Sequence, residues 1–126
     1  EGHVGVGTAL DFLLGRDGFT PIAGLVGGFH SSISMPVASV ASYLNVPQVS
    51  WGSTNSDLSS KAQYPFFCRT IPPDSIQGAA MWQFISHFEI PSVTLVYSTE
   101  PYGEGLFQVI SSLAAMANET FRVSGV

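Results

Sequence analysis

The sequence predicts an α/β fold of parallel, doubly wound sheets, and two observations point to it. Strand-like and helix-like segments alternate along the 126 residues, as they do in βαβ units. The chain is also 45% hydrophobic and only 10% charged, with no Asp, Glu, Lys or Arg from Gly18 to Ser56. Parallel strands covered on both faces give such runs. Pro21, Pro36 and Pro47 break this one too often for a membrane-spanning helix.

The first part of the chain predicts a helix end, a strand and a second helix, in that order. Residues Ala9–Leu14 resemble a last helical turn, which Gly15 would close. The short apolar run Pro21–Val26 predicts a strand. The apolar residues of the next helix recur at helical spacing: Ile33, Val37, Val40, Ala41 and Leu44. Because proline is tolerated only in the first helical turn, Pro36 places the expected start of this helix near Ser34.

Two further strands and a long polar loop follow. Val46–Trp51 and Phe66–Ile71 predict the strands, and Gly52–Gln63 predicts the loop between them. Two consecutive prolines then stop the third strand. We therefore expect residues 1–73 to belong to one α/β layer and residues 74–126 to begin a second.

The second layer repeats the alternation of helix and strand. Asp74 or Ser75 is expected to cap a helix, and Val93–Tyr97 predicts a strand. The helix expected after Gly103 carries an apolar stripe on one face: Leu106, Ile110, Leu113 and Ala117. Phe121–Val126 predicts the start of another strand.

Charge and cysteine content exclude several functions. The net charge is −5 and only four residues are basic, so no cluster of Lys and Arg exists to bind nucleic acid or an anionic membrane surface. The single Cys68 allows no internal disulfide, and the apolar run Pro65–Cys68 predicts a buried, inert thiol. The residues His3, His30 and His87 lack the spacing of metal ligands, so we expect neither a metal nor a cofactor.

Polar groups follow the carboxyl ends of all four predicted strands that have a segment after them. Parallel sheets bind ligands at this edge. The candidate binding residues are Ser31, Ser32, Gly52, Ser53, Thr54, Asp74 and Tyr102. Each has a simpler explanation by itself, such as helix capping by a serine or aspartate, or an ordinary turn. Together they complement a zwitterion, because hydroxyl and N–H donors suit a carboxylate, while an acid and an aromatic ring suit an amine.

Catalytic motifs are sparse. The sequence has no phosphate-binding loop of the Gly-Lys-Ser/Thr type and no G-x-S-x-G nucleophile elbow. His30 beside Ser31 leaves a small α/β hydrolase as a rival, although neighbours in sequence rarely form a nucleophile–base pair. Asn118 begins an N-x-T sequon, a candidate glycosylation site in a secreted chain.

Several motifs resemble the ligand-binding domain of metabotropic glutamate receptors and other class C G-protein-coupled receptors. The resemblance covers roughly residues 22–110 and is most specific in the run Tyr64–Asp74 (YPFFCRTIPPD). It extends to Val46–Trp51 (VPQVSW), Val93–Tyr97 (VTLVY) and Tyr102–Glu104 (YGE). Natriuretic-peptide receptors and bacterial amino-acid-binding proteins share the pattern more loosely.

The resemblance implies a type I periplasmic-binding-protein fold, in which two lobes close on a ligand by a hinge motion. The chain would span the end of lobe 1 and the start of lobe 2. In the family, the serine matching Ser32 and the backbone near Gly52 hold the ligand carboxylate. The residues matching Thr54, Asp74 and Tyr102 surround its α-amino group. Phe29 and His30 replace the smaller residues that the family has in this turn, which implies a pocket of different shape. Pro36 replaces a helix-compatible polar residue of the family.

The resemblance also implies a setting and partners. The domain would lie on the extracellular face of the plasma membrane, bind a small amino-acid-like ligand without chemistry, and pair with a second ectodomain through lobe 1. It would signal to a G protein through a transmembrane module outside this chain. The alternatives are a soluble or periplasmic amino-acid-binding protein and a ligand-free lobe used for dimerisation.

Overall fold

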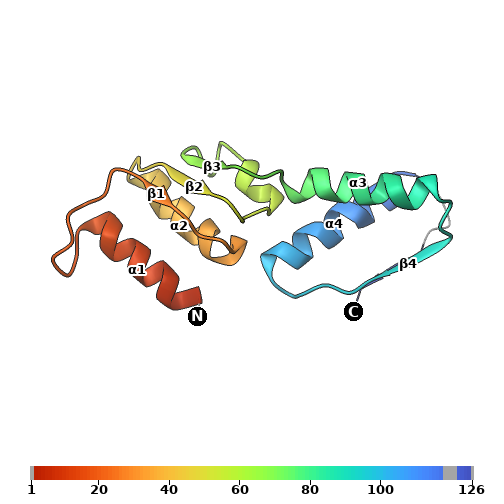
Figure 1. Ribbon diagram of the computed structural model, residues 1–126, viewed down its shortest axis with the longest axis horizontal. Helices are drawn as coiled ribbons and strands as arrows, with labels where there is room; N and C mark the ends of the chain where they lie inside the picture. Colours follow the sequence, from red (N-terminus) through yellow and green to blue (C-terminus); the bar gives the residue numbers. More distant parts are fainter. Residues whose placement is uncertain (1, 118–121, 126) are drawn as a thin grey trace. The chain divides into compact units, whose positions relative to one another are not determined.

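The computed structural model describes residues 2–117 and 122–125, and these form two compact units, Glu1–Ile71 and Pro72–Val126 (Figure 1). The division between the two units follows Ile71. Each unit combines helices with parallel strands, which confirms the predicted α/β class. No helix in the described ranges is both long and apolar enough to cross a membrane.

The first unit has a three-stranded sheet whose order follows the sequence. Its elements are α1 (Gly2–Leu14), β1 (Leu25–Val26), α2 (Ser31–Tyr43), β2 (Gln48–Ser50), the 3₁₀ helix η1 (Ser56–Ser59) and β3 (Phe67–Arg69). All three strands are parallel. Helices α1 and α2 pack on each other, and Figure 1 shows them side by side in red and orange.

The core of this unit lies between α2 and the polar loop. Ala38 packs with Leu58, Tyr64 and Phe67, all of them buried, and Met35 covers the cluster. The loop expected at Gly52–Gln63 therefore contributes a buried residue, Leu58 from η1. Apolar burial of this kind fixes an otherwise polar segment against the helix.

Two sequence-based predictions for this unit are wrong. Helix α2 begins at Ser31 rather than near Ser34, and Pro36 lies inside it. Because proline has no N–H, the carbonyl of Ser32 has no helical hydrogen bond from residue 36. The helix forms although this bond is missing in its second turn. Cys68 is exposed rather than buried, because strand side chains alternate and Cys68 points away from the face that carries buried Phe67.

The second unit contains α3 (Asp74–His87), β4 (Ser92–Leu95), α4 (Pro101–Met116) and β5 (Arg122–Gly125). Strands β4 and β5 are parallel and in register from Ser92↔Arg122 onward. Helices α3 and α4 pack together at Gly78, where an added Cβ would lie 2.5 Å from Val109 Cγ1. Only glycine lets the helices approach so closely.

Candidate functional site

A network of serine hydroxyls holds the turn after β1 in the first unit. The carbonyl oxygen of Gly28 lies 2.7 Å from Ser50 Oγ and 3.1 Å from both Ser34 Oγ and Ser53 Oγ. The N–H of Gly28 donates to Ser34 Oγ at 3.1 Å, and Ser34 Oγ and Ser53 Oγ are 2.7 Å apart. These serines come from α2, β2 and the loop after β2. The network therefore links the turns that follow β1 and β2.

Gly52 lies close to the turn that follows β1. A Cβ at this position would lie 2.3 Å from Phe29 Cδ2 and 2.8 Å from the carbonyl oxygen of Phe29, so a larger residue would push the turns apart. The Gly52 N–H donates to Ser50 Oγ at 3.2 Å. The backbone of Gly52 thus belongs to the same network.

The two serines that begin α2 have different surroundings. Ser31 is buried, and its Oγ accepts a hydrogen bond from the N–H of Asn55 at 3.2 Å. Ser32 is exposed. The N-cap is His30, which makes no side-chain cap hydrogen bond, so helix capping by either serine is wrong. The first turn of α2 keeps the partial positive charge of a helix N-terminus without a side-chain acceptor at its cap.

Thr54 lies next to this helix start, because its neighbour Asn55 is bonded to Ser31. Its Oγ1 is buried and has no hydrogen-bond partner in the described structure. Burying a hydroxyl without a partner costs about 1–3 kcal/mol, so such groups are uncommon unless something else binds there. Ser53 is different: it is fully buried, and its hydroxyl lies within hydrogen-bond distance of Gly28, Phe29 and Ser34.

Sequence reasoning missed three members of this site: Ser34, Ser50 and Arg69. The Arg69 guanidinium donates from one nitrogen to the carbonyls of Ser53 and Asn55, at 3.1 and 2.8 Å. The signal that could have identified Arg69 is its rarity, because the chain has only four Lys and Arg residues. No pattern distinguishes the two network serines from other serines of the chain.

Asp74 is the first residue of α3 in the second unit. The N-cap is Pro73, without a side-chain cap hydrogen bond, so the expected capping by Asp74 or Ser75 is wrong. Asp74 is fully buried, both carboxylate oxygens included. An acidic residue in the first turn suits the helix macrodipole.

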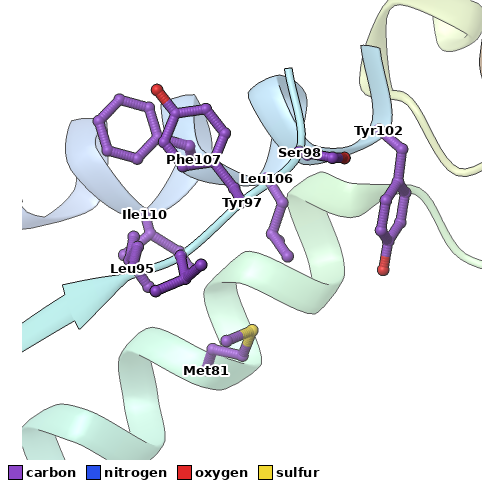
Figure 2. A pocket seen from close by; sticks show the side chains of 10 residues that line it. Met81, Leu95, Tyr97, Ser98, Tyr102, Leu106, Phe107 and Ile110 are labelled. Carbon is purple, nitrogen blue, oxygen red and sulfur yellow. The ribbon is translucent and has the colours of Figure 1, made fainter. Parts of the chain in front are cut away.

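Tyr102 stands in the first turn of α4 and is 45% exposed. It lines a pocket of about 280 Å³ between α3, β4 and α4, with mostly apolar neighbours. Figure 2 shows Tyr102 and Ser98 at one end of this pocket, with Met81 of α3 and Leu106 of α4 facing it. Tyr97 stacks on Phe107 at 4.6 Å between ring centroids. Tyr102 is therefore the accessible candidate of this unit.

The surroundings of Ser31 and His30 do not support the hydrolase alternative. Ser31 Oγ is engaged by the Asn55 N–H, and the ring of His30 meets Phe29 edge-on at 5.1 Å. Among residues 2–117 and 122–125, no group of three potential ligands could hold a metal ion. The glycosylation candidate Asn118 lies outside the described residues.

Comparison with known proteins gives a consistent picture. The family model described as "Receptor family ligand binding region" matches residues 1–125. A probable metabotropic glutamate receptor of Caenorhabditis elegans, mgl-1, is 42% identical over 83 residues, which are 66% of this chain and 8% of that relative. The metabotropic glutamate receptor of Drosophila melanogaster is 34% identical over 104 residues, 82% of this chain and 11% of the relative. The chain thus spans only about a tenth of these relatives.

Proposed function

Because the chain belongs to the receptor family ligand-binding region family, we propose that it forms part of an extracellular domain that senses a small amino-acid-like ligand for a G-protein-coupled receptor. The relatives named above are receptors, and the resemblance noted in the sequence is confirmed at that level. The ligand class, the extracellular setting, the G protein and a dimeric partner are parts of the proposal.

The observation that carries the proposal is the start of α2 together with Thr54. The helix begins without a side-chain cap, so its first N–H groups and the exposed Ser32 hydroxyl suit the carboxylate of a ligand. Thr54 Oγ1 is a buried oxygen without a hydrogen-bond partner among the described residues, and a ligand ammonium would supply a donor. In this proposal the side chains of Ser31 and Ser53 and the backbone of Gly52 hold the turns in place, and they do not hold the ligand.

The amine end of the ligand would also use Asp74 and Tyr102. A carboxylate pairs strongly with an ammonium when both are shielded from water, and an aromatic face attracts a cation. The ligand would then shift the population toward a closed form by its higher affinity for that form. This is binding without catalysis.

A ligand-free lobe that serves dimerisation is the second candidate. The apolar surface of Val26 and Val49, exposed on the sheet, favours it, because large exposed apolar side chains mark interaction surfaces. This candidate predicts no response to amino acids.

A thermal-shift screen of free amino acids against the complete ligand-binding region tests the proposal. We expect one amino acid class to raise the melting temperature in proportion to the logarithm of its concentration above Kd. Ser32→Ala and Thr54→Val should weaken this response. Ser39→Ala, at an exposed serine of α2 bonded to its own helix, and Thr20→Val, at an exposed loop threonine, are the matched controls. A folded protein that no amino acid stabilises would contradict the proposal and favour the dimerisation lobe.

A further inference from the structure

We propose that Arg69 is a positioning residue of the ligand site, which fixes Thr54 by holding the carbonyl groups on both sides of it. The inference rests on the proposed function and adds a residue that makes no contact with the ligand itself. Its basis is the arrangement of four groups in the first unit: Arg69, Ser53, Thr54 and Asn55.

Arg69 reaches this loop from the end of β3. It pairs in register with Ser50 of β2, a member of the serine network, and the N–H of the next residue, Thr70, donates to the Ser50 carbonyl at 3.0 Å. The base of the Arg69 side chain is therefore anchored in the sheet. Its guanidinium extends along the loop after β2.

The guanidinium brackets Thr54. One nitrogen, Nη1, donates to the carbonyl of Ser53 at 3.1 Å and to that of Asn55 at 2.8 Å. The other, Nη2, is bonded to the hydroxyl of Ser59 at the end of η1. A planar fork of fixed donors can hold several carbonyls at once, which a lysine ammonium on a flexible stem does less well.

Thr54 differs from its two neighbours in this loop, because its side chain is positioned only by its backbone. Ser53 is tied down by its hydroxyl, and Asn55 by its N–H to Ser31 Oγ. Within residues 2–117 and 122–125, Thr54 Oγ1 has no hydrogen-bond partner, so the direction of this hydroxyl follows from the backbone that Arg69 fixes. A hydroxyl held in place before binding loses less entropy when a ligand arrives.

Lys61 provides a matched control. Its Nζ also donates to a backbone carbonyl, that of Phe67, but this bond does not flank Thr54. Losing this bond at Lys61 therefore removes a cation-to-carbonyl contact without moving the Thr54 hydroxyl.

A double-mutant cycle on the complete ligand-binding region tests the inference, with the amino acid identified by the thermal-shift screen as the probe and calorimetric Kd as the readout. We expect Arg69→Lys to weaken binding about tenfold, and to weaken it by less than about twofold when Thr54 is already valine. Lys61→Met should leave Kd unchanged. If the wild type binds and Arg69→Lys leaves Kd unchanged, or its effect simply adds to that of Thr54→Val, the inference is overturned.

Failure of the proposed function gives a different result, because the wild type then binds no amino acid at all. If Arg69→Lys does not fold, Ser59→Ala replaces it in the cycle, since it removes one partner that holds the guanidinium. A weaker affinity that depends on Thr54 supports the inference. An unchanged affinity with Ser59→Ala overturns it.

Discussion

Replacing Thr54 by valine should stabilise the ligand-free protein while it weakens binding, a combination that an ordinary structural residue does not give. Valine has nearly the shape of threonine, so packing is retained. The change removes a buried hydroxyl that makes no hydrogen bond to any residue that the structure describes, and such a group destabilises the folded state by about 1–3 kcal/mol. Taking the lower part of this range, we expect the free energy of unfolding to rise by about 1 kcal/mol.

Urea unfolding of the complete ligand-binding region without ligand measures this effect. With a denaturant dependence of about 2 kcal/mol per molar, a gain of about 1 kcal/mol moves the midpoint up by about 0.5 M. Thr20→Val, at an exposed loop position, should leave the midpoint unchanged. A midpoint that falls in Thr54→Val would show that the hydroxyl is satisfied in the folded protein, and the reasoning that makes Thr54 a ligand group would be refuted.

Two further predictions concern the fold. Gly78→Ala should destabilise the protein by about 1–3 kcal/mol, because its Cβ would lie 2.5 Å from Val109 Cγ1. The control is Gly7→Ala in α1, where an added Cβ meets nothing within 4 Å, so this change should stabilise the protein by up to about 1 kcal/mol. Equal effects of the two changes in urea unfolding would contradict the close packing of α3 and α4. The exposed Cys68 should react with a thiol reagent about as fast in the native protein as in urea; much slower labelling of the native protein would mean that the face of Val26, Val49 and Cys68 is covered.

The sequence predicted the fold well where periodicity carries the information. The alternation of elements, the end of α1 at Leu14 with Gly15 in a left-handed conformation, and the parallel strands all follow from local pattern. Cys68 was mispredicted because an apolar run shows that a strand has apolar neighbours but not which of its faces is covered. The start of α2 was mispredicted because the proline rule weighs one lost hydrogen bond and not the tertiary contacts that hold Ser31.

The candidate site could be predicted only in part, and two pairs of neighbouring hydroxyl residues show the physical reason. Ser31 and Ser32 are neighbours, as are Ser53 and Thr54, and sequence cannot rank the members of either pair. The structure does, since Ser31 and Ser53 bond to the opposite turn, over separations of more than 20 residues that no local pattern encodes. Successive side chains point in different directions, so one hydroxyl of each pair bonds to the opposite turn and its neighbour does not. The buried pair sets the geometry, and we infer that Ser32 and Thr54 are the pair whose hydroxyls a ligand would meet.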